Sequence, residues 1–355
     1  MTDLLSFTAE LVDIPSVSHH ERAITDHLEG LLRAVPWLDV ERVGENLVAR
    51  TAGTKAGPRL LLAGHTDTVP PNGNERARID GDVLWGLGSA DMKSGVAVLI
   101  ELARTVERPA IPVTYVFYEC EEVDAKYNGI ERLFNERPDL LEADAAILAE
   151  PTGALVEAGC QGTMRLVASF GGERAHTARA WLGRNAIHRL GDVLQRLSSY
   201  LPREVDIDGC HFREGVQAVL VEGGVAHNVV PDSAVLTVNH RFAPDRTSEE
   251  AETLVRGLLV EADRIEVTDM APPAPPSLGH PLLAGLLERV GQPPRGKLGW
   301  TDVGRFAARG VPAANFGPGD PKLAHHAEER VQRAEIDQAY SVLRSLLEEG
   351  VQEPG

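Results

Sequence analysis

Histidine and carboxylate side chains follow apolar segments of strand length at several places in the chain. The segment at 59–65 leads into GHTDTVP, so His65 and Asp67 lie at the end of an apolar run. Residues two apart in a strand point to the same side, so His65 can bind a metal ion while Asp67 holds its second ring nitrogen. The alternative interpretation is a loop histidine beside an aspartate that caps a turn.

Carboxylates occupy similar positions further along the chain. Asp91 lies in the glycine- and serine-rich turn GLGSADMKSG before a helical pattern, where an N-cap aspartate is the simpler interpretation. YECEEV places Glu121 and Glu122 at the end of the apolar segment 113–119, and LAEPTG places Glu150 at the end of the next one. Crowded like charges repel unless something positive neutralises them, which favours a bound cation over a solvated strand end.

These positions meet if the apolar segments are strands of one sheet, because open α/β sheets bind ligands at the carboxyl ends of their strands. Two adjacent histidines in LAHHAEE at 323–329 add nitrogen donors. Histidine and carboxylate donors without thiolates favour zinc, cobalt or manganese. Two such ions, about 3.5–4 Å apart, share a bridging carboxylate and a water. The sequence therefore predicts a hydrolytic centre with two divalent metal ions.

Strand-like and helix-like segments alternate in the first and last parts of the chain. This alternation predicts an α/β sheet with helices on both faces. Before residue 162, the strand patterns lie at 59–65, 113–119 and 145–150 and the helical patterns at 4–12, 21–35, 94–106 and 128–137. After the proline-rich segment APPAPPS at 271–277, helical patterns return at 281–290, 301–308 and 335–348, with one strand at 311–316.

The middle of the chain predicts a second domain. Its segments follow the order β-α-β-β-α-β, with strand patterns at 163–170, 216–222 and 234–240 and helical patterns at 182–199 and 248–261. This order is typical of a small α+β domain whose sheet has one open face. The predicted layout is a discontinuous α/β domain of residues 1–162 and 272–355 that carries an inserted domain at 163–271.

Composition excludes some classes of function. The formal net charge of −18 argues against a nucleic-acid partner, since phosphate binding needs clustered lysine and arginine. None of Cys120, Cys160 and Cys210 belongs to a CxxC pair, which argues against a disulfide framework or a thiolate zinc site. The sequence has neither an apolar run of about 18 residues nor an N-terminal basic region followed by an apolar core. These features predict a cytoplasmic protein with no membrane partner.

Five motifs in a fixed order resemble those of the dinuclear zinc aminoacylase and carboxypeptidase family. They are GHTDTVP, GLGSADMKSG, EEV, EPT and a late histidine before an acidic pair, and the resemblance covers nearly the whole chain. It implies a catalytic domain with a zinc-peptidase-like sheet covered by helices, and an inserted ferredoxin-like dimerisation domain. It also implies a homodimer that acts on a small acyl-amino acid with two zinc ions, with cobalt or manganese as alternatives.

Five residues match metal ligands of the family: His65, Asp91, Glu122, Glu150 and His325. The resemblance implies that Asp91 bridges the two ions. His65 and Glu150 would complete the ligands of the first ion, and Glu122 and His325 those of the second. The family keeps the histidine nearest the preceding strand, so His325 is preferred to the histidine that follows it. A cis peptide bond after Asp91 is also a feature of the family.

Other matched residues would act around the metal ions or on the substrate. Asp67 would orient His65, and Glu121 would be the general base. In the inserted domain, His176 matches a histidine that reaches the active site of the other subunit, where it can stabilise the developing oxyanion. Three residues match substrate-binding positions: Asn228 in HNVVPD, Arg241 in NHRF and Thr301 in GWTDVGRF.

Two further segments indicate the acyl group. EAGCQGTMR and AHTARAWLGRNAIH are similar to the actinobacterial type of succinyl-diaminopimelate desuccinylase. The similarity implies hydrolysis of N-succinyl-LL-2,6-diaminopimelate to succinate and LL-2,6-diaminopimelate, a step of lysine biosynthesis. Gln161 stands where the proteobacterial branch has an arginine that binds the substrate's carboxylate. Either the acyl preference differs, or another base replaces that arginine: Arg179, Arg184 or Arg241.

Two alternatives to this function remain at the level of sequence. The first is acetylornithine deacetylase or another N-acyl amino-acid amidohydrolase, which would share the metal centre but differ in the acyl group. The second is a non-catalytic homologue that binds metal or amino acids. Glu121 beside Glu122 argues against the second, because a protein that only binds needs no general base next to its ligands.

Overall fold

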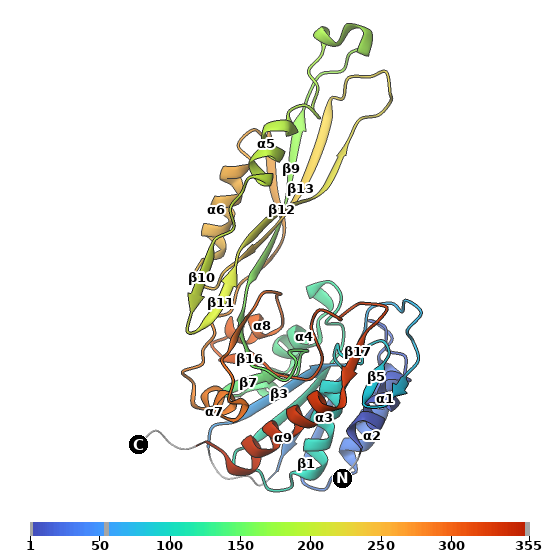
Figure 1. Ribbon diagram of the computed structural model, residues 1–355, viewed down its shortest axis with the longest axis vertical. Coiled ribbons are helices and arrows are strands. Elements are labelled where there is room, and N and C mark those ends of the chain that lie inside the picture. Colours follow the sequence, from blue (N-terminus) through green and yellow to red (C-terminus); the bar gives the residue numbers. More distant parts are fainter. Residues whose placement is uncertain (1–2, 53–56, 352–355) are drawn as a thin grey trace. The chain divides into compact units, whose positions relative to one another are not determined.

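The protein is described by a computed structural model that covers residues 3–52 and 57–351 (Figure 1). Its internal contacts divide the described residues into two compact units. The first unit draws on Met1–Gly159, Pro276–Arg295 and Arg305–Gly355, and the second on Cys160–Pro275 and Gly296–Gly304. Across the described ranges, no helix combines the length and apolar character that crossing a membrane requires.

Residues 296–304, which the sequence pattern places in the first domain, group with the second unit. Backbone and side-chain hydrogen bonds account for this. The carbonyl oxygen of Lys297 accepts the N–H of Gln161, and the indole N–H of Trp300 donates to the carbonyl of Pro272.

The first unit is built on an eight-stranded mixed sheet in the order β1-β2-β6-β3-β7-β16-β8-β15. Its strands are β1 (Leu38–Val43), β2 (Asn46–Thr51), β3 (Leu60–His65), β6 (Val113–Tyr118), β7 (Ala145–Leu148), β8 (Glu157–Cys160), β15 (Arg295–Lys297) and β16 (Ala313–Asn315). The central strands β6, β3, β7 and β16 are parallel. Every side chain of β3 and β6 is buried, as expected for parallel strands covered on both faces.

Helices cover both faces of this sheet for a topological reason. Helix α3 (Lys93–Thr105) joins β3 to β6, and α4 (Gly129–Glu136) lies in the return from β6 to β7 on the far side of β3. Parallel crossovers are right-handed, so these opposite steps place α3 and α4 on opposite faces. The other helices of this unit are α1 (Leu4–Val12), α2 (Arg22–Arg33), α7 (Pro281–Val290), α8 (Val303–Ala307) and α9 (Arg333–Glu349).

A small side sheet in the order β17-β5-β4 joins distant parts of the first unit. Its strands are β4 (Arg78–Asp80), β5 (Val83–Trp85) and β17 (Arg330–Gln332). Because β17 pairs antiparallel with β5, the chain that follows His325 runs beside the chain that precedes Asp91. Two segments more than 200 residues apart are therefore held together by backbone hydrogen bonds.

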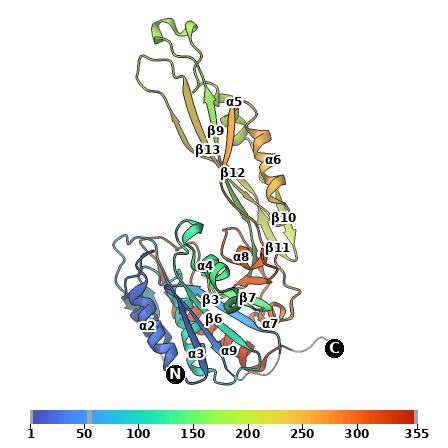
Figure 2. The same cartoon turned by 180° about the vertical axis from the view of Figure 1, so that it is seen from behind.

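The second unit is an antiparallel four-stranded sheet in the order β12-β13-β9-β14. Its elements are β9 (Gly162–Gly171), α5 (Leu190–Ser198), β10 (Glu204–Ile207), β11 (Cys210–Arg213), β12 (Gly215–Gly223), β13 (Ser233–Phe242), α6 (Ser248–Leu258) and β14 (Arg264–Ala271). The β-α-β-β-α-β order and this strand order are those of a ferredoxin-like fold, with the β10–β11 hairpin added. Both α5 and α6 lie on one face of the sheet, seen from two sides in Figures 1 and 2. The predicted fold class is confirmed.

One predicted helix, at 182–199, is wrong in its first half. Residues Thr177–Leu182 form a 3-10 helix, and α5 begins only at Leu190. In between, Arg184 forms an isolated β-bridge with Glu173 through two backbone hydrogen bonds, which holds the chain extended. A side chain at Gly183 would contact the Glu173 carbonyl at 2.6 Å, so this close approach requires glycine. The apolar periodicity of residues 182–199 gives no information about these long-range contacts.

The core of the second unit contains a buried histidine. His240 on β13 is fully buried and packs at 5.4 Å from the ring of Phe242, and its Nδ1 lies 3.0 Å from the carbonyl oxygen of Gly215. Its Nε2 has no hydrogen-bond partner among the described residues. Burial lowers the pKa of His240, although the nearby Glu214 carboxylate partly opposes this effect.

We expect this unit to lose stability in mild acid because of His240. The unfolded histidine takes up a proton as the pH falls through its ordinary pKa of about 6.5, while the folded one stays neutral. The stability that depends on the neutral ring is therefore complete above about pH 6.5 and is lost as the pH falls below it. Urea unfolding of the full chain at pH 7.5 and pH 5.5 should show a smaller acid loss for His240→Phe than for the wild type. Equal losses in the two proteins would contradict the assignment.

Candidate metal centre

The carboxyl ends of three parallel strands deliver the candidate residues to one edge of the large sheet. His65 is the last residue of β3, Glu121 and Glu122 follow β6, and Glu150 follows β7. Helix α3 can lie against this edge because Gly95 has no side chain: a Cβ there would contact the carbonyl of Ala149 at 2.2 Å. The sheet topology thus brings together residues that are up to 85 positions apart.

Two histidines face the two oxygens of Asp91. The Nε2 atom of His65 lies 3.1 Å from Oδ1 of Asp91, and the Nε2 atom of His325 lies 3.7 Å from Oδ2. His325 Nε2 is also 2.8 Å from Oε1 of Glu122. Ligating atoms of His65, Asp91 and Glu122 all lie within 4.8 Å of one another. His325 has a φ of 63°, a left-handed conformation that the surrounding backbone must hold.

Asp67 connects His65 to the turn after β6. Its carboxylate is fully buried, with Oδ1 3.4 Å from Nδ1 of His65, and its backbone carbonyl oxygen lies closer to the same nitrogen, at 3.1 Å. The same carboxylate accepts the backbone N–H groups of Glu121 and Glu122 at 3.0 and 3.1 Å and the hydroxyl of Ser18 at 2.7 Å. Asp67 therefore orients a candidate ligand through its backbone carbonyl and its carboxylate, and the carboxylate also fixes the backbone of the two glutamates.

The remaining candidates also lie in this unit. Glu150 is 5% exposed, and its charge contributes to raising the pKa of His65. Glu121 is half-buried, and its backbone is held by Asp67. The peptide bond between Asp91 and Met92 is cis, as the family resemblance implied.

Negative charge dominates this part of the molecule. Burial lowers the pKa of His65, but hydrogen bonds and charges from Asp67 and Asp91 outweigh burial and raise that pKa well above its ordinary value. The hydrogen bond with Glu122 raises the pKa of His325 to about 9, against the effect of burial. The carboxylates thus favour the protonated form of both imidazoles. The same negative charge would attract divalent cations, which displace these protons when they bind.

The donor set fits a pair of divalent ions. A bridging carboxylate must offer one oxygen to each ion, and the two oxygens of Asp91 each face a different imidazole nitrogen. Glu122 lies on the His325 side, and the charge of Glu150 acts on His65. Oxygen and nitrogen donors without thiolate suit zinc, cobalt or manganese.

Three buried residues that hold the acidic turns were missed from the sequence. Glu329 accepts the N–H groups of Ala90 and Asp91. Glu21 accepts the N–H of Cys120, and the side-chain oxygen of Asn46 accepts that of Glu119. No spacing in the sequence links them to the turns, although Glu329 lies within the motif LAHHAEE.

The candidates in the second unit fall into two groups. His176 forms a β-bridge with Val229, and the N–H after it donates to the carbonyl of Asn228. Both side chains are exposed. Thr301 is buried, and its carbonyl oxygen lies 3.9 Å from Sγ of Cys160. Arg241 pairs with Thr163 at the other end of β9, which begins two residues after Cys160.

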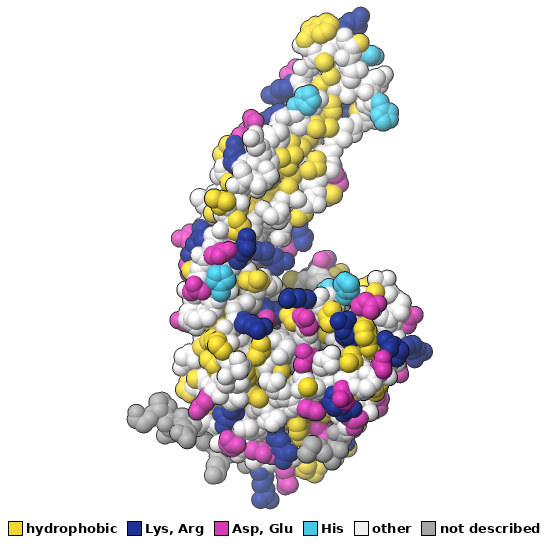
Figure 3. Space-filling view, in the orientation of Figure 1, with side chains coloured by type: hydrophobic (Ala, Val, Ile, Leu, Met, Phe, Trp, Pro, Cys, Tyr) yellow, Lys and Arg dark blue, Asp and Glu magenta, His cyan; other side chains and the backbone are white. Residues whose placement is uncertain are grey.

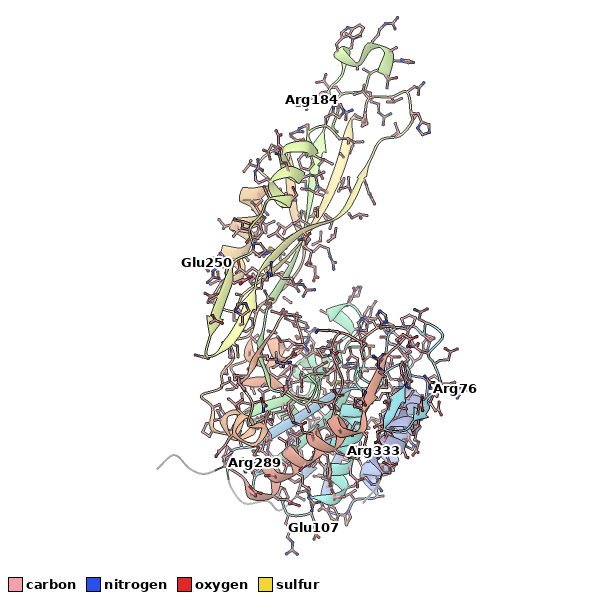
Figure 4. The ribbon with its side chains drawn as sticks, in the orientation of Figure 1. Arg76, Glu107, Arg184, Glu250, Arg289 and Arg333 are labelled. Atoms are coloured by element: carbon pink, nitrogen blue, oxygen red, sulfur yellow. The ribbon has the colours of Figure 1, made fainter. Side chains whose placement is uncertain are left out.

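The two groups lie beyond opposite ends of one strand pair. Strand β9 pairs with β13 from Thr163 opposite Arg241 to Gly171 opposite Ser233. Eight residue steps in a strand span roughly 25 Å. The His176 group continues beyond Gly171, at the end of the unit where Figure 4 labels Arg184. The structure therefore does not bring His176 and Asn228 together with Arg241 and Thr301 within this unit.

Comparison with known proteins gives close relatives over the full length. The pattern described as Peptidase family M20/M25/M40 matches residues 61–349. A succinyl-diaminopimelate desuccinylase of Corynebacterium glutamicum is 43% identical over 357 residues, which cover 98% of this chain and 96% of that protein. A Mycobacterium tuberculosis protein that carries the same enzyme name provisionally is 52% identical over 347 residues, covering 97% of this chain and 98% of its own.

Solved structures share the fold. An aminopeptidase from Bacillus cereus matches 98% of this chain and 97% of its own with a TM-score of 0.81 and 20% identity. A Bacillus subtilis protein described as a dinuclear metal binding peptidase matches 97% and 96% with a TM-score of 0.72 and 17% identity. Identities this low show a common architecture alone, whereas the family pattern and the full-length relatives show descent. The chain belongs to peptidase family M20/M25/M40.

Proposed function

We propose that the protein hydrolyses the amide bond of N-succinyl-LL-2,6-diaminopimelate to succinate and LL-2,6-diaminopimelate, in diaminopimelate and lysine biosynthesis. The reaction type rests on the arrangement of Asp91 between His65 and His325, with a carboxylate base candidate in the adjoining turn. The acyl group rests on full-length relatives at 43% and 52% identity that carry this enzyme's name. A cytoplasmic location follows from the biosynthetic reaction.

Two divalent metal ions, which we assign as zinc with cobalt or manganese as alternatives, would be held by residues of the first unit. The ligands would be His65, Asp91, Glu122, Glu150 and His325, with Asp91 as the bridge. When bound, such a pair of ions supplies Lewis acidity that activates a water molecule and polarises the scissile carbonyl. Asp67 keeps the imidazole of His65 in position through its second nitrogen, the usual device for a histidine ligand.

Glu121 is assigned as the general base. It accepts the proton of the attacking water and passes it to the amide nitrogen, which leaves as the amine of LL-2,6-diaminopimelate. The Asp67 carboxylate fixes the N–H groups of both Glu121 and Glu122. The base and the adjacent ligand therefore keep their places relative to each other during the proton transfer.

Recognition of the substrate's carboxylate is assigned to Arg241 rather than Gln161. The Gln161 side chain is 1% exposed and donates to the carbonyl of Arg213 at 2.9 Å, so its position serves the fold. Arg241 is partly buried, and its guanidinium makes no hydrogen bond or ion pair within residues 3–52 and 57–351. A guanidinium in that state gains from binding a carboxylate. Asn228 and Thr301 are assigned as further substrate contacts.

A homodimer would share its active sites through His176. The two groups of substrate residues in the second unit lie roughly 25 Å apart along β9, too far for one small acyl-amino acid to touch both. A two-fold pair of chains resolves this, because His176 of one subunit then serves the other subunit's substrate as an oxyanion donor. Residues 163–271 would form the dimerisation and lid domain, and residues 1–162 and 272–355 the catalytic domain.

The exposed edge of the second unit supports such pairing. Strand β12 is the edge strand of its sheet, and Val219, Leu220 and Val221 on it are each about half exposed. Figure 3 shows apolar side chains gathered along this unit. An unpaired edge with apolar side chains is a surface that natural proteins normally cover.

A hydrolysis panel tests the proposed function. We expect the metal-reconstituted protein to cleave N-succinyl-LL-2,6-diaminopimelate with a kcat/KM at least tenfold above that for N-acetylornithine. Chelation should abolish turnover, and zinc or cobalt should restore it. Faster cleavage of N-acetylornithine would assign the protein as a deacetylase. Metal binding without cleavage of any substrate would assign a non-catalytic homologue.

A further inference from the structure

Glu329 is a buried carboxylate that is not among the expected metal ligands. It is 1% exposed, and its Oε1 atom accepts two adjacent backbone N–H groups, of Ala90 at 2.9 Å and of Asp91 at 3.0 Å. A single oxygen therefore holds the peptide groups on which the bridging aspartate is built. The cis peptide bond follows immediately, between Asp91 and Met92.

The backbone of Glu329 binds the same turn and its own histidine segment. Its carbonyl oxygen accepts the N–H of Gly86 at 3.1 Å, and its N–H donates to the carbonyl of His326 at 3.0 Å. The next residue, Arg330, pairs with Trp85 at the start of the β17–β5 ladder. Glu329 thus connects the segment that carries His325 to the turn that carries Asp91. Both its side chain and its main chain make hydrogen bonds to that turn.

A second contact reinforces this connection. The side-chain amide of Asn74 donates to the carbonyl of His326 at 3.2 Å, and the carbonyl of Asn74 accepts the N–H of Leu87 at 2.7 Å. The buried Lys93 amine donates to the carbonyl of Ile14 at 2.8 Å; burial lowers the pKa of Lys93 to about 7, and the charge of Glu329 opposes this effect. Burial raises the pKa of Glu329 to about 7, and the N–H groups of Asp91, Ala90 and Gly88 oppose this effect.

We propose that Glu329 is a positioning residue, which holds the Asp91 turn against the His325 segment so that the two oxygens of Asp91 face His65 and His325 at the same time. The proposal deepens the proposed two-metal function and rests on it. Residues that orient a metal ligand through a hydrogen bond usually contribute 10- to 100-fold to metal affinity. Glu329 orients its ligand through the main chain, which leaves both carboxylate oxygens of Asp91 available.

The test compares metal binding by Glu329→Ala, Glu329→Gln and a control. Alanine removes the acceptor, whereas glutamine keeps an oxygen that can accept both N–H groups. The control is Glu214→Ala in the second unit, which also removes a buried carboxylate that accepts a backbone N–H, that of Ala243 at 3.2 Å. Affinity for Zn²⁺ is measured by titration against a competing chelator, and the visible absorption of the Co²⁺-loaded proteins reports ligand geometry.

We expect Glu329→Ala to bind the two metal ions about 10- to 100-fold more weakly than the wild type does, and to show an altered Co²⁺ absorption spectrum. Turnover should show a lower kcat with little change in KM, because the substrate contacts are untouched. Glu329→Gln should recover most of the lost affinity. The control should lose stability without losing metal affinity.

Several outcomes would overturn the proposal. Wild-type affinity in Glu329→Ala would do so while leaving the proposed function intact, as would equal losses of affinity in that variant and in Glu214→Ala. If Glu329→Ala does not fold, wild-type affinity and spectrum in Glu329→Gln support the proposal, and a full loss in the glutamine variant contradicts it. A wild-type protein that binds no metal would overturn this proposal and the proposed function together.

Discussion

Replacing Glu121 with glutamine is expected to lower kcat by about 100- to 10,000-fold while the protein keeps its metal ions. The substitution preserves the shape of the side chain and removes its ability to accept a proton. The backbone N–H of residue 121 still donates to Asp67, so the turn that carries Glu122 should stay in place. In free energy the loss corresponds to roughly 3–5 kcal/mol of transition-state stabilisation.

Glu119 supplies a matched control two residues earlier. Its carboxylate is bound to the side chains of Asn46 and Arg132, and no chemical role is assigned to it. Glu119→Gln should therefore change kcat far less than Glu121→Gln does. Steady-state kinetics and metal analysis of the two variants make the comparison. A Glu121→Gln enzyme with more than a tenth of the wild-type kcat would mean that another group takes the proton.

Mixing two inactive variants is expected to restore activity. A His176→Ala chain lacks the proposed oxyanion donor, whose loss costs about 100- to 1,000-fold in kcat. A Glu121→Ala chain lacks the base. If His176 serves the other subunit, each mixed dimer contains one site with both residues intact. Random exchange in an equal mixture then yields about a quarter of the wild-type activity for a two-fold dimer.

Two controls make this result decisive. Subunit exchange is verified with chains of different affinity tags. His188→Ala tests the effect of changing an exposed histidine of the same unit. The hydrogen bonds of His188 use its backbone, which donates to the side-chain oxygen of Asn185 and accepts the N–H of Gly191, so we expect this variant to remain active by itself. If exchange occurs and the mixture stays inactive, His176 acts within its own chain or has no role in catalysis.

The positions of several candidate residues at one sheet edge could be predicted from the sequence, because local pattern and sheet topology coincide there. His65, Glu122 and Glu150 each follow a continuous apolar run, and such runs become parallel strands whose carboxyl ends share one edge. The apolar alternation of β9, β12 and β13 likewise predicted the second sheet. The continuous runs indicate strands that are buried on both faces, and the alternating runs indicate strands that are buried on one face.

Contacts between distant segments could not be predicted in this way. The 3-residue strands β5 and β17 are too short to show a period, so the ladder that joins the His325 segment to the Asp91 turn left no pattern. Glu329 resembles any surface glutamate in sequence, yet it is buried, and its carboxylate accepts two backbone N–H groups of the Asp91 turn. The absence of helix at 183–189 similarly depends on the bridge with Glu173.

The length of the β9–β13 ladder sets the distance between His176 and Arg241, because the two residues lie toward opposite ends of it. Each residue added to both strands would increase that distance by about 3.4 Å. A single insertion in one strand would also turn every following side chain to the opposite face of the sheet. If subunits share active sites as proposed, we expect insertions and deletions in related chains to fall in the loops and in the added β10–β11 hairpin, while the ladder keeps its length.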